Sequence, residues 1–205
     1  MEKIPLEEML CKNLLLNPND KLYREAGRYL GYESDTKIPA QINAMIQKAM
    51  VEICATAEPR TICRYFSVRN DVNFQYEGII LMGATLGVSV DRLLSRAQVQ
   101  NMAYALILDS CATAAIEEVC DNLQNNLINI YADRNMYLTN RHSPGYGNLP
   151  LSTQPNFILL LDAERKIGLG TTRNFLLTPL KSVTAMILVS RSQQKKERIP
   201  CNACV

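Results

Sequence analysis

Between residues 38 and 56 the apolar positions recur at intervals of three and four, which is the spacing of one face of an amphipathic helix. Pro39 suits the first turn of this helix, where its missing N–H would have no partner. Residues 61–68 alternate instead and are rich in β-branched and aromatic side chains, so they predict a strand. Apolar runs at 78–86 and 181–189 predict two further strands.

The strongest helical periodicity begins near Gln98 and persists for about thirty residues. We expect Ser89 or Ser95 to cap a helical region just before it, because a serine side chain can accept a hydrogen bond from a free N–H of the first turn. Small residues occupy the middle of the long helix at 112–115, which is typical of close helix packing.

The last third of the sequence predicts a loop at 139–151 and then one more helix. Ser152 can cap the start of that helix, and Gly168 suits its C-terminal stop. A hairpin turn is expected at Arg173-Asn174, before the final strand.

Helices and strands are therefore interspersed, but without the regular βα alternation of a doubly wound fold. The pattern predicts an α+β fold with a mixed, mainly antiparallel sheet flanked by helices. We expect residues 1–190 to form a single domain with a helical N-terminal part up to about residue 57, and residues 191–205 to form a polar tail.

Composition narrows the function classes. Apolar residues make up 47% of the chain and charged residues 20%, and the net charge of +2 argues against a dedicated nucleic-acid binder. No apolar run approaches the ~18 residues of a membrane span. Acidic residues stand near the N-terminus where a signal peptide would have its apolar segment, so we expect a cytoplasmic protein.

The seven cysteines are an odd number, and five of them lie in apolar surroundings typical of buried thiols in a reducing compartment. Cys201 and Cys204 alone have the spacing of metal ligands. Two thiolates cannot complete a tetrahedral zinc site. The pair is either half of a shared metal site or an incidental feature of the tail.

The segment from Arg141 to Pro150 concentrates a fixed cation, a hydroxyl, a phenol, two prolines and two glycines within ten residues. Proline removes a backbone donor and glycine costs chain entropy, so neither a helix interior nor a strand interior favours this mixture. A shaped loop that binds something does favour it.

Motifs for unaided catalysis are missing. The sequence has no Gly-x-Ser-x-Gly elbow, no Walker phosphate loop and no complete dinucleotide fingerprint. His142 is the single histidine, which excludes multi-histidine metal sites and most histidine relays. We therefore expect the chain to bind and position a molecule that is already reactive.

The order Arg141-x-x-x-Gly145-Tyr146, with Pro150 four residues later, resembles the signature of the reactivation domain of cobalamin-dependent methionine synthase. The resemblance covers roughly residues 75–190 and implies that domain's fold. Supporting similarity lies in Ile116-Glu117-Glu118, in the helical segment 160–164, and in Thr178-Pro179-x-x-Ser182-Val183.

The resemblance implies an S-adenosylmethionine-binding subunit for methionine biosynthesis. In that family the domain presents the ligand's methyl group to cobalamin after an electron donor, typically flavodoxin, has reduced cob(II)alamin. The chemistry belongs to the two cofactors, and the protein supplies orientation and electrostatics. The chain lacks a cobalamin-carrying Asp-x-His-x-x-Gly segment, so the cobalamin would be carried by a separate methionine synthase subunit or another corrinoid protein.

The same resemblance implies residue roles. Arg141 would pair with the carboxylate of S-adenosylmethionine, with a surface salt bridge as the alternative. Gly145 would allow close approach of the ligand or corrin, and Tyr146 would be the catalytic residue at the junction with cobalamin. Glu117 would bind the ribose or balance the sulfonium, unless it is a solvated helix residue. Secondary candidates in the same loop and cleft are Ser143, Pro144, Gly147 and Ser182.

Two other functions remain open at this point. The chain could be a non-catalytic adaptor or chaperone of a corrinoid protein that has lost the methyl donor. It could also be a metal or redox protein that uses Cys201 and Cys204.

Overall fold

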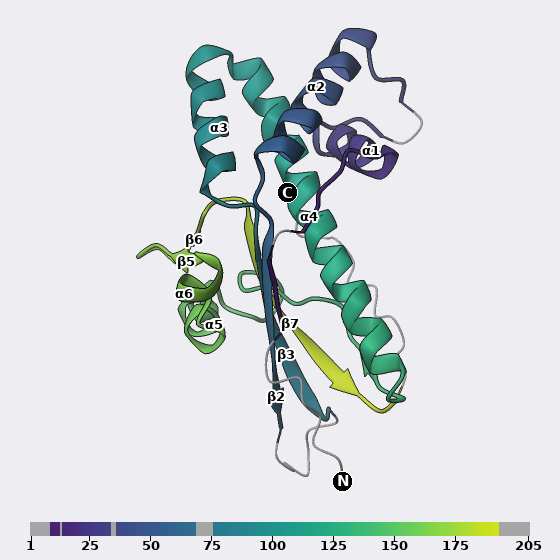
Figure 1. Ribbon diagram of the computed structural model, residues 1–205, viewed down its shortest axis with the longest axis vertical. Helices are drawn as coiled ribbons and strands as arrows, with labels where there is room; N and C mark the ends of the chain where they lie inside the picture. The colour runs from purple at the N-terminus through teal and green to yellow at the C-terminus, as the bar shows by residue number, and fades with distance from the viewer. Residues whose placement is uncertain (1–8, 13, 34–35, 69–75, 193–205) are drawn as a thin grey trace.

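The computed structural model describes residues 9–12, 14–33, 36–68 and 76–192, which contain a five-stranded antiparallel sheet (Figure 1). The order across the sheet is β1-β2-β3-β7-β4, and every neighbouring pair is antiparallel. The predicted sheet type is therefore confirmed. Its strands are β1 (Met9–Lys12), β2 (Arg60–Ser67), β3 (Gly78–Thr85), β4 (Tyr137–Leu138) and β7 (Ser182–Ser190).

The central strand β3 is covered on both faces, which explains its uninterrupted run of apolar and small residues. Its register places Met82 opposite Cys63 of β2 and Ala185 of β7. Side chains alternate between the two faces. Ile80 and Met82 join the core under the long helix, and Leu81 joins the core on the other side.

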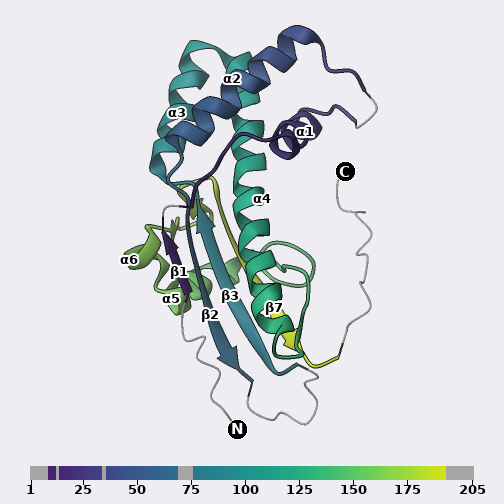
Figure 2. The same ribbon diagram turned by 45° about the vertical axis from the view of Figure 1, so that its right-hand side comes forward.

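One long helix, α4 (Met102–Ala132), lies along one face of the sheet (Figure 2). Its 31 residues rise about 46 Å, whereas the eight residues of β3 span about 27 Å. The helix therefore extends past the sheet, and three shorter helices pack around its projecting part (Figure 1). These helices are α1 (Asp20–Tyr29), α2 (Ala40–Thr56) and α3 (Val88–Gln100).

The helix caps differ from those expected. Neither Ser89 nor Ser95 caps a helix, because both lie inside α3, which begins after Gly87 at φ +86°. The long periodic segment is interrupted at Asn101, whose side chain accepts a hydrogen bond from the N–H of Tyr104 and starts α4. The amide oxygen of asparagine satisfies one of the free N–H groups in the first turn.

The opposite face of the sheet is covered by the short helices α5 (Gln154–Leu161) and α6 (Ala163–Ile167) (Figure 1). The expectation of one continuous helix from Ser152 to Gly168 is wrong, because Asp162 at φ +53° interrupts it. Ser152 belongs to a preceding 3₁₀ turn, η1 (Leu151–Thr153), although Gly168 does form the C-terminal stop. The strands β5 (Gly170–Thr171) and β6 (Leu177–Thr178) form the expected hairpin around residues 173–174.

The fold is α+β, as predicted, with a separate apolar core on each face of the sheet. Helices α1–α4 and one set of strand side chains form the larger core, and the N-terminal helices contribute Leu22 and Ile46 to it. Phe157, Leu161 and Ile167 dominate the smaller core. Within the described part of the chain, no helix combines the length and the apolar character that crossing a membrane requires.

Candidate functional site

The loop with the Arg-x-x-x-Gly-Tyr motif is attached to the edge of the main sheet. After β4, His142 forms a β-bridge with Met186 of β7, and each of the two N–H groups donates to the other residue's carbonyl at 2.9 Å. Nearer to β4, the Thr139 N–H also donates to a carbonyl of β7, that of Leu188. The backbone of His142 therefore fixes the loop on the sheet.

A tight turn follows the bridge. The Gly145 N–H donates to the Leu149 carbonyl at 2.8 Å, and the Tyr146 N–H donates to the Ser143 carbonyl at 3.2 Å. Gly145 adopts φ +91°, a conformation that strains any residue with a Cβ atom. Pro144, the residue before it, is buried. Glycine is needed here for the backbone conformation, whatever else the turn does.

Arg141 points from this loop to the long helix α4. Its Nη2 atom lies 3.0 Å from Oε2 of Glu117 and 3.0 Å from Oδ1 of Asp121. The arginine side chain is only 18% exposed, whereas the two carboxylates are about 40% exposed. The structure thus brings together Arg141 and Glu117, two of the predicted binding residues, and adds Asp121 as a second acceptor.

The Asp121 carboxylate also connects the loop to the N-terminal helix α1. Lys21 of α1 lies 3.0 Å from Oδ2 of Asp121 and 2.6 Å from Oε2 of Glu118. Burial alone would raise the pKa of Asp121, but hydrogen bonds from Lys21 and Arg141 outweigh it and lower the pKa below its ordinary value. The hydrogen bonds with Glu118 and Asp121 also raise the pKa of Lys21. Asp121 is therefore ionised at neutral pH and shared by two cations.

One end of the Arg141 guanidinium has no partner among the described residues. Its Nη1 atom is buried and makes no hydrogen bond with them, although it carries two N–H donors. Arg141 also lines a polar hollow of about 460 Å³, together with Asp121, Gln124, Asn125 and Asn140. Because Nη2 is held by two carboxylates, the guanidinium is already oriented, and its remaining donors are suited to an additional oxygen acceptor.

Sequence reasoning missed Asp121, Lys21 and a third cation, Lys181. The Nζ atom of Lys181 lies 2.8 Å from Oδ1 of Asp109 and 2.9 Å from Oγ1 of Thr113. One signal was readable, because Asp109, Thr113, Glu117 and Asp121 are spaced four apart and so share one stripe of α4. The approach of Lys21 and Lys181 to that stripe had no local signal.

The other predicted residues have different surroundings. Tyr146 is 77% exposed, so its ring projects from the turn and is not a packing residue. Gly147 is exposed at φ +57°. Ser143 contributes its carbonyl to the turn. The Ser182 hydroxyl lies 2.8 Å from the Thr85 hydroxyl and donates to the Pro179 carbonyl, so its described bonds are made away from the loop.

Cys201 and Cys204 lie outside the described residues. Among the residues that are described, no group of three or more histidine, cysteine, aspartate or glutamate side chains is arranged to hold a metal ion. Cys54 and Cys111 form no disulfide bond within the described part of the chain, and burial raises the pKa of Cys54 to about 11 and that of Cys111 to about 12. The thiols of Cys54 and Cys111 are therefore protonated at neutral pH.

Comparison with known proteins gives a fold and no sequence family. No protein-family model matches the sequence, and no curated protein matches it. Among solved structures, a crystal structure of the MetH reactivation domain bound to AdoHcy superposes with a TM-score of 0.67. The match covers 92% of this chain and 80% of that chain at 13% sequence identity. The chain therefore has the fold of that domain.

Proposed function

We propose that this chain binds S-adenosylmethionine between the Arg141 loop and α4, and that it serves the reductive remethylation of a cobalamin carried by a separate protein. The observation that carries the proposal is the Arg141 guanidinium, which is oriented by two carboxylates and retains a buried, unused donor nitrogen. It lies in an Arg-x-x-x-Gly-Tyr loop on the fold of a domain whose crystal structure contains AdoHcy.

The ligand carboxylate is assigned to Arg141. With Nη2 held by Glu117 and Asp121, the ligand carboxylate would reach Nη1 from the hollow that Arg141 lines, once the groups that cover Nη1 move aside. A charge-assisted hydrogen bond of this kind contributes about 1.5–3 kcal/mol. The two carboxylates prevent the side chain from rotating away, so little side-chain entropy is lost on binding.

The charge of the surrounding cluster complements the ligand. Three carboxylates, those of Glu117, Glu118 and Asp121, face two cations, Arg141 and Lys21, which leaves one excess negative charge. S-adenosylmethionine has one net positive charge, because its sulfonium adds to the zwitterionic amino acid. S-adenosylhomocysteine lacks the sulfonium and is neutral. The cluster therefore favours the methyl donor over the product of methyl transfer.

The residues of the turn are assigned to the cobalamin side. Reduced cobalamin would supply the nucleophile that accepts the methyl group, and this chain would hold the donor at the right distance and exclude water. Tyr146 projects into solvent and offers a ring face and a hydroxyl to a docked partner. Gly145 keeps the turn narrow beside it. An electron donor such as flavodoxin would act on the partner's cobalamin.

Calorimetric titration tests the binding step. We expect the parent protein to bind S-adenosylmethionine, and Arg141→Ala to bind it about 10- to 100-fold more weakly. Arg173→Ala is the matched control, because Arg173 is exposed on the β5–β6 hairpin and has no ion pair among the described residues. Circular dichroism of each variant would verify folding.

The outcomes separate the proposal from its rivals. If the parent does not bind S-adenosylmethionine, the proposal is wrong and the adaptor or chaperone function takes its place. If Arg141→Ala binds as tightly as the parent, the ligand binds but the role of Arg141 is wrong. Metal analysis of the protein with and without residues 201–205 would test the metal or redox alternative.

A second measurement tests Tyr146. With a cobalamin-loaded corrinoid protein and a chemical reductant, the conversion to methylcobalamin can be followed by visible absorbance. We expect Tyr146→Ala to bind S-adenosylmethionine within about threefold of the parent, and to slow remethylation by tenfold or more. Equal rates for the variant and the parent would remove Tyr146 from the reaction.

A further inference from the structure

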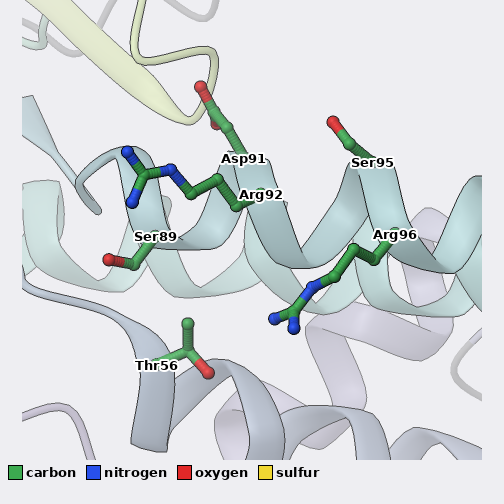
Figure 3. Close-up of a pocket in the computed structure, with 6 residues that line it drawn as sticks. All are labelled: Thr56, Ser89, Asp91, Arg92, Ser95 and Arg96. Atoms are coloured by element: carbon green, nitrogen blue, oxygen red, sulfur yellow. The ribbon is translucent and has the colours of Figure 1, made fainter.

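A second hollow, of about 670 Å³, lies between the C-terminal end of α2 and the helix α3. It belongs to different elements from those that hold Arg141, and none of its residues has a role in the function proposed above. The size is within the range of small-molecule sites, which is about 300–1,000 Å³. Its lining residues are Thr56, Ser89, Asp91, Arg92, Ser95 and Arg96 (Figure 3).

The positively and negatively charged side chains of the lining lie on different sides of α3. Ser89, Arg92 and Arg96 are spaced three and four residues apart, so they share one face of α3. Figure 3 shows Arg96 extending toward Thr56 of α2, and Arg92 extending above Ser89. Asp91 points to the other side of α3, where its Oδ2 atom accepts a hydrogen bond from the Leu180 N–H at 2.9 Å. The side of α3 that faces α2 therefore has two guanidiniums and no carboxylate of its own.

No carboxylate of the described residues is paired with either guanidinium. Among the residues that the structure describes, Arg92 and Arg96 form no ion pair and no hydrogen bond. Glu58 is the carboxylate bonded to a lining residue, through Ser89 Oγ at 3.4 Å. Its other oxygen already accepts from Arg60 at 2.9 Å, so Glu58 is neutralised by a different cation.

Two like charges one helical turn apart repel each other, and an anion between them removes that cost. Guanidiniums present paired N–H donors that match the oxygens of a phosphate, and hydroxyls such as those of Thr56 and Ser89 are further hydrogen-bonding groups. The hollow is much larger than a phosphate ion, which leaves room for the body of a larger molecule beside the charged end.

We propose that this hollow binds a small phosphate monoester, with its phosphoryl group between Arg92 and Arg96 and the remainder of the molecule in the space between α2 and α3. This site is independent of the Arg141 site, so it stands or falls separately from S-adenosylmethionine binding. Free phosphate and a nucleotide share the recognised group, and the test distinguishes them.

The test is calorimetric titration of the full chain at constant ionic strength with inorganic phosphate, adenosine 5′-monophosphate and adenosine. We expect the monophosphate to bind at least tenfold more tightly than inorganic phosphate, and adenosine to show no binding. The double variant Arg92→Gln, Arg96→Gln should lose at least tenfold in affinity for both phosphate compounds. The charge-preserving variant Arg92→Lys, Arg96→Lys should recover part of that loss.

Arg173→Gln removes an exposed arginine elsewhere and should leave binding unchanged. Arg92 and Arg96 are both exposed, so the double variants should fold, which circular dichroism would verify. The proposal is overturned if the parent binds neither phosphate compound, if the double variant binds both as the parent does, or if Arg173→Gln weakens binding equally. Binding of phosphate without any preference for the monophosphate would overturn the small-molecule part, and leave a simple anion site.

Discussion

The two arginine sites of this chain place the same side chain in opposite electrostatic surroundings. Arg141 is largely covered and is bonded to Glu117 and Asp121, so its charge is neutralised before any ligand arrives. Arg92 and Arg96 are exposed and have no described partner. The first arrangement fixes geometry and contributes to stability, whereas the second attracts anions and contributes little to stability. A ligand at Arg141 must use the donors that remain, and a ligand at Arg92 and Arg96 must supply the missing charge.

The largest difference is expected from removing one charge at each site. Arg141→Met should lower the free energy of unfolding by about 1–3 kcal/mol, because it leaves two partly buried carboxylates without their shared donor. Arg92→Met should change it by less than about 0.5 kcal/mol, because Arg92 is exposed and has no ion pair with any residue that the structure describes. Urea denaturation of both variants measures the contrast, and similar values would contradict it.

A smaller effect is expected from the carboxylate that joins the loop to α1. Asp121→Asn should cost about 1 kcal/mol, because it weakens hydrogen bonds from both Lys21 and Arg141. A double-mutant cycle with Lys21→Met would isolate the coupling between α1 and α4. Additive effects in that cycle would mean that Lys21 and Asp121 do not stabilise each other in solution.

Acid should abolish the contribution that the Asp121 carboxylate makes to the free energy of unfolding. The pKa of Asp121 is lowered in the folded protein, so its carboxylate stabilises the fold above its ordinary pKa of 3.8, and this stability is lost as the pH falls through the folded value. The difference in unfolding free energy between the parent and Asp121→Asn should therefore be constant from pH 7 to about pH 5 and shrink as the pH approaches 3. A difference that does not depend on pH would contradict the ion pairs.

The smallest effect is expected from the repulsion between Arg92 and Arg96. Arg96→Gln should raise the free energy of unfolding by about 0.2–0.5 kcal/mol at low salt, because it removes a like charge one turn from Arg92. The gain should diminish as sodium chloride is added, since salt screens exposed charges. Thermal unfolding at two salt concentrations measures it, and a loss of stability at low salt would show that Arg96 has a favourable partner.

Much of the architecture could be read from the sequence, because its signals are local. The period of three and four marks α2, and the alternation at 61–68 marks β2. The helix at 152–168 was predicted as one piece, because the left-handed conformation of Asp162 has no strong sequence signal. Asn101 was overlooked as a cap for a different reason: asparagine is a favoured cap residue, but the apolar period continues across it.

In the candidate site, too, some features could be predicted from the sequence and others come only from the structure. Arg141, Gly145 and Tyr146 could be singled out because they form a compact motif, and the stripe that contains Glu117 and Asp121 follows from the spacing of four. That the turn needs a glycine at position 145 was consistent with its composition, but the φ of +91° comes from the structure. The functional roles of these residues stay predictions until the titrations are made.

The sequence by itself determined α2, most of α4, the three long strands, the α+β class and the loop that carries the motif, because side-chain periodicity acts within a few residues. Only the tertiary structure decided which charges meet. Lys21 reaches Asp121 across one hundred positions of sequence, and Arg141 reaches Glu117 across twenty-four. Such contacts depend on the path that the whole chain takes when it buries its two cores, and no local pattern encodes that path. The same packing left Arg92 and Arg96 facing α2 without a described counter-charge.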